Sequence, residues 1–436
     1  MSTALEAGGS PAVDDGMIDW TGDGPADQGT STAQREFSAV DGCYRLTVPG
    51  IALEVDRLRR DRGSLAGELI VRCTLPGARA VDERGTISAA DFGLSAQRSR
   101  QERANLLEKR SGNAAIDWYG LIEELCLRVI QAERIGEPGV YLREAPPPSP
   151  ERSIEVIPGF PILRDEFQIH FGDGGSLKSL IALYQAGKLH RDDTRIGFFD
   201  WEWSAANHRG RFERMFGPDM PGVFYVRCER PLVDESDRLR RIIREQGIDF
   251  GFFDSIGAAC DGDPSAAEVA NAYYRAMRSL RIGSVHLAHI TKGENSDLRP
   301  FGSIFWHNNA RATWFYRQAT DNPDTRYVDL ALFNRKANTG PKLPPVGLEV
   351  AFDDNRIQVY RRDVAQMAEF ASKLPVWQRM IAALRTGPMT QAALASELEV
   401  SGDAIKKAVQ RGRNTFTRVE SSDGITRVAL VERGSR

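Results

Sequence analysis

One stretch of the sequence brings glycines, a lysine and a serine together at a spacing that suits phosphate binding. Three glycines follow an apolar segment, and Lys178 and Ser179 come just before a second apolar run that is compatible with a helix. Glycines let backbone N–H groups turn toward phosphate oxygens, the lysine reaches the β- and γ-phosphates, and the hydroxyl is a Mg²⁺ ligand. The positive end of the helix dipole adds to this attraction. The predicted phosphate loop consists of Gly172, Asp173, Gly174, Gly175, Ser176, Leu177, Lys178 and Ser179.

This loop departs from the usual pattern at one position. Leu177 stands where a glycine normally precedes the lysine, and its side chain either fits beside the phosphates or crowds them. The alternative interpretation of the stretch is a glycine-rich turn before an ordinary helix. We favour a phosphate loop that binds ATP with Mg²⁺, because an apolar strand before it and a helix after it are the context that this motif requires.

A further candidate for Mg²⁺ binding is an aspartate at the end of a downstream apolar segment. Asp254 follows the run IDFGFF, which has the composition of a buried strand. An acidic residue at the end of such a strand, beside a phosphate loop, can complete the Mg²⁺ shell. The alternative is an aspartate that only caps the junction between strand and loop. The phosphate loop upstream favours the metal-binding role.

The composition allows several domains and sets few limits on partners. The chain has 436 residues, of which 41% are hydrophobic and 27% charged, with a formal net charge of −3. This length accommodates about two to four domains. Because the whole chain is close to neutral, its charge neither demands nor excludes nucleic acid, and any DNA-binding face must be a local patch.

Cysteine usage and hydropathy point to a reducing compartment. The five cysteines are scattered and form no CxxC pair, which argues against a disulfide framework or a zinc site and fits the cytoplasm. No run of about 18 apolar residues exists, so no membrane span or membrane partner is expected. The N-terminus lacks the basic and apolar regions of a secretion signal.

The N-terminal third is predicted to contain one small domain between two irregular segments. Residues 1–40 are rich in Gly, Ser, Ala and Asp, and we expect them to be disordered. Residues 41–143 predict a small α+β domain with a hairpin and two helices. Its basic cluster at Arg57–Arg62 would either touch nucleic acid or, as its alternation with Leu58 favours, form a solvated strand face. Residues 144–153 are a proline-rich linker.

The remaining sequence predicts a large core and a separate C-terminal domain. Residues 154–365 alternate strand-like and helical segments as a parallel α/β sheet requires, and then become strand-rich without long helices. Residues 375–436 read as three helices and a hairpin with a turn at 421–424, a winged helix-turn-helix pattern. We favour duplex DNA as its partner over protein contacts, because the third helix and its exit carry basic residues. These residues are Lys406, Lys407, Arg411 and Arg413.

The segment FFDWEW leads to a known class of proteins. Phe-Asp-x-Glu at the end of the strand after the phosphate-loop helix resembles the RecA-like ATPases, which are P-loop NTPases. The resemblance implies that Glu202 polarises the attacking water and that Asp200 supports it. Asp254-Ser255 is similar to the magnesium site of that class, to which Ser179 also contributes. SVHLAHITK resembles the strand whose polar end senses the γ-phosphate, and that residue would be His289.

Within this class, residues 155–362 resemble the RepA-type hexameric replicative helicases of plasmids and phages. The similar segments are GDGGSLKSLIALYQA, RPFGSIFWHNNARATWF and FNRKANTGPK. In such proteins, basic residues of the last segment reach the ATP of the neighbouring subunit. The resemblance therefore implies that Arg335 or Lys336 acts as a finger supplied in trans. The alternative for both is salt-bridged surface charge at the end of a strand.

The same resemblance implies an oligomer, most simply a hexameric ring, with single-stranded DNA in its channel. The polar loop at 291–300 would line that channel, with Lys292, Arg299 and Phe301 as DNA contacts. A second candidate channel loop, ACDGDPSAAE, is acidic, which counts against a simple basic pore. We therefore predict a Mg²⁺-dependent ATPase that acts on DNA. The alternatives are an ATP-switched regulator or loader without unwinding activity, and a DNA-binding scaffold with a degenerate ATPase core.

Overall fold

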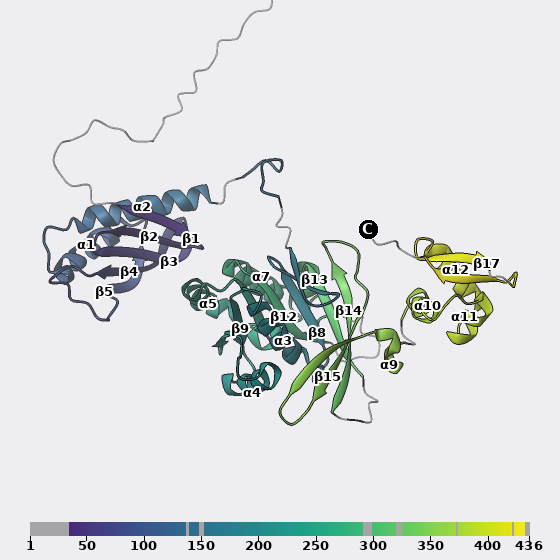
Figure 1. Cartoon of the computed structure of the whole chain (residues 1–436). Coiled ribbons are helices and arrows are strands. Elements are labelled where there is room, and N and C mark those ends of the chain that lie inside the picture. Colours follow the sequence, from purple (N-terminus) through teal and green to yellow (C-terminus); the bar gives the residue numbers. More distant parts are fainter. Residues whose placement is uncertain are drawn as a thin grey trace, which may run out of the picture. The chain divides into compact units, whose positions relative to one another are not determined.

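The computed structural model describes residues 35–136, 139–147, 152–290, 299–319, 324, 326–371, 374–420 and 423–431. The chain divides into two compact units, Met1–Pro138 and Gly139–Arg436 (Figure 1). Within the described residues, none of the helices combines the length and the apolar composition that crossing a bilayer requires.

The first unit is a five-stranded antiparallel sheet with two helices packed against it. Residues of β4 alternate between buried and partly exposed, as expected for a sheet with one covered face. The apolar stripe of α2 covers that face with Leu121, Leu125 and Val129. The bounds are β1 Glu36–Val40, β2 Cys43–Val48, β3 Ile51–Asp61, β4 Ser64–Cys73, β5 Thr86–Gly93, α1 Gln97–Ser111 and α2 Trp118–Ile135.

Two expectations for this unit are decided by its sheet. The prediction that residues 1–40 are disordered is wrong at its C-terminal end, because β1 pairs with β2 from Glu36↔Thr47 to Val40↔Cys43. Residues 1–34 lie outside the described residues. The basic cluster forms ion pairs within the unit: Arg57, Arg59 and Arg60 each meet a carboxylate. These pairs agree with a solvated strand face.

The core of the second unit is a nine-stranded mixed sheet in the order β10-β9-β11-β12-β8-β13-β14-β15-β16. Strands from β10 to β13 are parallel to their neighbours, and those from β13 to β16 are antiparallel. This confirms the predicted parallel α/β core with an antiparallel extension. The bounds are β8 Phe167–Gly172, β9 Ile196–Asp200, β10 Phe224–Arg227, β11 Phe250–Asp254, β12 Gly283–His289, β13 Ala312–Gln318, β14 Tyr327–Ala337, β15 Val346–Phe352 and β16 Ile357–Arg362.

Helices cover both faces of this sheet, which explains why its central strands are apolar on both sides. α5, α6, α7 and α8 share one apolar core with the sheet, and α3 and α4 share another. A short hairpin, β6 Ser153–Ile157 and β7 Phe160–Leu163, was not predicted and begins inside the expected linker. The helix bounds are α3 Lys178–His190, α4 Ala205–Phe216, α5 Leu232–Gln246, α6 Ile256–Ala259, α7 Ala267–Leu280 and α8 Ile304–Asn309.

The end of the chain forms three helices followed by a hairpin, in the predicted order. Ser401 caps α12 as expected, because its Oγ accepts a hydrogen bond from the Ala404 amide at 3.3 Å. Met380, Leu394 and Ile405 come from the three helices and form the buried core of this segment. Two short helical turns, η1 Val364–Gln366 and α9 Ala368–Ala371, precede it. The bounds are α10 Val376–Leu384, α11 Gln391–Glu397, α12 Gly402–Arg411, β17 Phe416–Glu420 and β18 Thr426–Leu430.

Candidate nucleotide site

The register of the parallel strands brings four predicted residues to the same edge of the sheet. His289 at the end of β12 is level with Gly172 at the end of β8, and Asp254 at the end of β11 is level with Asp200 at the end of β9. β12 lies between β8 and β11, so the four strand ends form one row. We call this row the carboxyl edge. Ligands of open α/β sheets bind outside the carboxyl ends of the strands.

The predicted phosphate loop turns tightly around the side chain of Lys178. The lysine Nζ donates hydrogen bonds to the carbonyl oxygens of Gly172 at 3.1 Å and Asp173 at 2.8 Å. A Cβ on Gly172 would lie 2.6 Å from the carbonyl oxygen of Tyr316, so only glycine fits there. Burial lowers the pKa of Lys178, and nearby carboxylates oppose this shift. The loop thus holds a buried ammonium group at the carboxyl edge.

The unusual Leu177 adopts the backbone conformation that explains why glycine is common at this position. Its φ angle is +57°, in the left-handed region, and it directly precedes the first residue of α3. Such a conformation costs a residue with a Cβ about 1–2 kcal/mol. The side chain compensates in part, because it packs against the apolar core beneath α3 and β13 to β16.

Asp254 presents a buried carboxylate oxygen that lacks a protein partner. The residue is 2% exposed, and no described group donates a hydrogen bond to its Oδ2 atom. Burial raises the pKa of Asp254 to about 6, a hydrogen bond with Ser179 opposes the shift, and the charge of Glu202 adds to it. An unpartnered carboxylate oxygen beside a serine hydroxyl is a donor set that suits Mg²⁺. The residues therefore fit the predicted metal.

Glu202 lies between the end of β11 and the end of β12. Its Oε1 accepts a hydrogen bond from the Ser255 hydroxyl and lies 3.9 Å from Nε2 of His289. His289 contributes most to lowering the pKa of Glu202, the Ser255 hydroxyl adds to this, and partial burial opposes it. Glu202 is therefore ionised at neutral pH, as a base or water-orienting group requires.

Asp200 holds the backbone that carries Glu202. Its Oδ1 accepts the amide N–H of Glu202 at 2.8 Å and that of Trp203 at 3.1 Å. Its Oδ2 lies 2.8 Å from Nε2 of the buried His208 and accepts the hydroxyl of Tyr225 at 3.2 Å. Asp200 thus supports Glu202 through its backbone and does not contact its carboxylate.

One residue that sequence reasoning missed is Arg211. Its guanidinium carbon lies 3.8 Å from the centre of the Trp203 ring, directly after Glu202 in the chain. Burial lowers the pKa of Arg211, and the charge of Asp254 opposes this shift. Among the described residues, Arg211 makes no hydrogen bond or ion pair. In the sequence it looks like Arg209 and Arg214 of the same helix, and only the tryptophan that holds it distinguishes it.

The two candidate trans residues have different surroundings. Lys336 donates hydrogen bonds to the carbonyl oxygens of His307 at 2.9 Å and Asn308 at 2.6 Å, so it caps the end of α8. Arg335 is the extra residue of a β-bulge, between pairs Thr313↔Lys336 and Trp314↔Asn334. Its guanidinium lies 5.4 Å from each of the Phe315 and Phe333 ring centres, and these ring contacts are its only ones with described residues. Neither residue is in the salt bridge that was the alternative.

The predicted DNA-contacting residues lie on exposed surfaces where they are described. Lys292 lies outside the described residues, as does most of its loop, and Arg299 is exposed at the end of that loop. Phe301 is also exposed and borders an apolar pocket next to His289. The basic residues of the C-terminal segment, Lys406, Lys407, Arg411 and Arg413, are all exposed.

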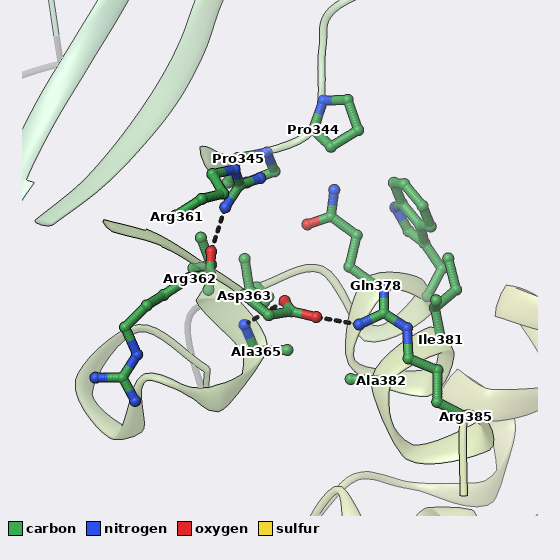
Figure 2. Close-up of a pocket in the computed structure, with 13 residues that line it drawn as sticks. Pro344, Pro345, Arg361, Arg362, Asp363, Ala365, Gln378, Ile381, Ala382 and Arg385 are labelled. Atoms are coloured by element: carbon green, nitrogen blue, oxygen red, sulfur yellow. Dashed lines mark hydrogen bonds and ion pairs between the residues drawn. The ribbon is translucent and has the colours of Figure 1, made fainter. Parts of the chain in front are cut away.

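A cavity of about 450 Å³ lies elsewhere in the second unit, between the end of β16 and α10. Figure 2 shows Asp363 at its centre, with its carboxylate accepting from the Ala365 amide and from Arg385 on α10. The first bond caps η1 and the second holds α10 to the core. Because these groups satisfy one another, we interpret the cavity as a junction and not as the nucleotide site.

Comparisons with known proteins give only distant similarities. No family model matches the sequence, and no curated protein matches it. The solved ATPase domain of a DnaB-like helicase is similar at 14% identity and a TM-score of 0.36, over 46% of this chain and 85% of that one. The flagellar accessory protein FlaH from Methanocaldococcus jannaschii is similar at 12% identity and a TM-score of 0.35, over 46% of this chain and 91% of that one. Likeness at these values does not by itself establish a family or a function.

Proposed function

We propose that this chain is a Mg²⁺-dependent ATP hydrolase with a RecA-like core that works as an oligomer on DNA. One observation carries the proposal: the carboxyl edge combines a glycine loop around a buried lysine, a buried carboxylate oxygen without a partner, and an ionised glutamate. Phosphate binding, metal binding and activation of a water are the three tasks that ATP hydrolysis requires.

Each residue of the edge has a role that follows from its surroundings. Lys178 binds the β- and γ-phosphates, exchanging its loop carbonyl partners for phosphate oxygens. Ser179 and Asp254 hold Mg²⁺, which when bound neutralises charge on the phosphates. Glu202 orients the attacking water, held by Asp200 through its backbone and by Ser255 through its carboxylate. His289, at 3.9 Å from Glu202, responds to the γ-phosphate.

The oligomer and the DNA are the finer part of this proposal. Arg335 supports an oligomer, since a guanidinium with only ring contacts inside its own chain is available to a neighbouring subunit. Lys336 is less suitable because its ammonium already caps α8. Exposed basic residues on α12 support contact with duplex DNA through a winged helix. A ring of the RepA type, with single-stranded DNA in its channel, combines these features.

The test is ATP turnover by the wild type and Glu202→Gln, with and without single-stranded DNA, alongside the mass of the particle in solution. We expect turnover that DNA stimulates, a loss of at least about 100-fold in the variant, and a ring-sized mass. The matched control is Glu213→Gln, an exposed glutamate on α4, which should behave as the wild type. Tight ATP binding without turnover in the wild type would contradict a hydrolase.

A second candidate function is an ATP-switched regulator or loader without unwinding activity. The acidic loop at 259–268 favours it, because a channel for DNA is expected to be basic. A DNA-binding scaffold with an inactive core is the third possibility. Unwinding of a forked duplex by the purified protein would exclude the second and the third together, whereas DNA binding without any ATP turnover would favour the third.

A further inference from the structure

The C-terminal segment gathers positive charge on one face. Lys406, Lys407 and Arg411 lie on α12, Arg413 follows it, and Arg418 lies on β17; all five side chains are exposed. We call these five residues the α12 cationic face. Within the described part of the chain, none of them makes a hydrogen bond or an ion pair.

This lack of partners is specific to the face and not general to the segment. Other arginines nearby are engaged: Arg427 pairs with Asp423 at 2.6 Å, Arg385 pairs with Asp363, and Arg379 donates to a backbone carbonyl. Ile405, Ala408 and Val409 fill the buried side of α12, so its charged residues must share the opposite side. A face of this kind repels itself and attracts polyanions.

The same chain contains a segment of opposite charge. Residues 1–34 carry six acidic side chains and no lysine, arginine or histidine. The acids are Glu6, Asp14, Asp15, Asp19, Asp23 and Asp27. Met17, Ile18 and Trp20 lie among them and can pack on lysine stems or over guanidinium groups. Fully extended, 34 residues span on the order of 110 Å, so length does not limit what the segment can reach.

We propose that residues 1–34 dock on the α12 cationic face and compete with DNA for it. The inference rests on the proposed function, because it treats this face as the DNA-binding one. The acids of the segment stand in for phosphates, and DNA must displace them before it binds. DNA affinity of the full chain is therefore held below what the face alone provides, and the difference disappears as salt screens both interactions.

The first experiment compares duplex DNA binding by the full chain and by a chain that lacks residues 1–34. At about 50 mM salt we expect the deletion to tighten binding roughly 10-fold, with a much smaller difference at about 300 mM. A full-length variant with the six acids changed to Asn or Gln should reproduce the deletion. Thr30→Ala with Thr32→Ala in the same segment is the matched control and should change nothing. Equal DNA affinity of all four proteins would overturn the inference.

The second experiment detects the contact without DNA. A fluorescent peptide of residues 1–34 is titrated into the chain that lacks them, and we expect binding that Lys406→Glu with Lys407→Glu weakens at least about 10-fold. Lys109→Glu, on the exposed side of α1, is the control for general charge and should leave binding unchanged. Peptide binding that ignores the α12 change overturns the inference. If no form of the protein binds DNA but the peptide still binds at α12, the docking stands and the proposed DNA-binding role fails.

Discussion

The carboxyl edge and the α12 cationic face both gather charge, but they hold it in opposite ways. At the edge, Lys178 and Asp254 are nearly buried, their neighbours shift both pKa values, and each side chain has a defined position. On α12 the charges are exposed and have no partners among the described residues. Burial makes the edge sensitive to single substitutions, whereas the face acts through its number of charges and is sensitive to salt.

The largest effect is expected for Lys178→Ala, which removes the buried ammonium from the edge. Because no other described cation is hydrogen-bonded within the phosphate loop, we expect ATP turnover to fall at least about 100-fold. Steady-state turnover measures this, and thermal unfolding reports whether the fold persists. Lys188→Ala is the control, since that lysine lies at the other end of α3, 5.5 Å from the Tyr184 ring. Full activity of Lys178→Ala would break the assignment of the edge as the nucleotide site.

The next effect concerns Asp254, whose burial is useful for binding and unfavourable for folding. Because the pKa of Asp254 is raised to about 6, its proton favours the folded state, and this stability is lost as pH rises from about 4 to about 6. Asp254→Asn removes the ionisation, so without nucleotide we expect it to be more stable than the wild type at pH 7.5 by up to about 3 kcal/mol.

Urea unfolding of both proteins at pH 4 and pH 7.5 measures this difference, and the variant should also lose Mg²⁺-dependent ATP binding. Comparing the two proteins at each pH removes the contribution of other titrating groups. A stability gap that is the same at both pH values would show that Asp254 is ordinarily solvated, and the contrast between the two regions would weaken.

A smaller effect is expected for Arg211, which we place beside the edge because it stacks on Trp203 and senses Asp254. Arg211→Ala should lower ATP turnover about 10-fold, and Arg211→Lys should recover part of it because the positive charge returns without the flat stacking surface. Arg209→Ala, an exposed arginine on the same helix, is the matched control. Equal behaviour of the Arg211 and Arg209 variants would return Arg211 to the surface.

How far the sequence predicts each region follows from the length of its patterns. The mixed sheet was predictable because alternating apolar strands and helices leave periodic signals, and the row of Gly172, Asp200, Asp254 and His289 follows from parallel strands ending together. Arg211 was not predictable, since its stacking depends on the turn between β9 and α4. The first strand was missed because β1 is short and largely exposed, and its pairing with β2 is a tertiary effect.

The smallest effect per residue is expected on the α12 cationic face, where salt provides the sharpest measurement. Lys406→Ala with Lys407→Ala should weaken duplex binding about 10-fold at low salt and reduce the slope of log affinity against log salt by about 2, one counterion for each lost charge. ATP turnover without DNA should stay unchanged, because the carboxyl edge holds its charges by burial. Changing Lys178 should do the reverse, abolishing turnover while leaving this slope alone. A double variant that lowers turnover without DNA, or an unchanged salt slope, would mean that the two regions are not the independent electrostatic devices that their burial indicates.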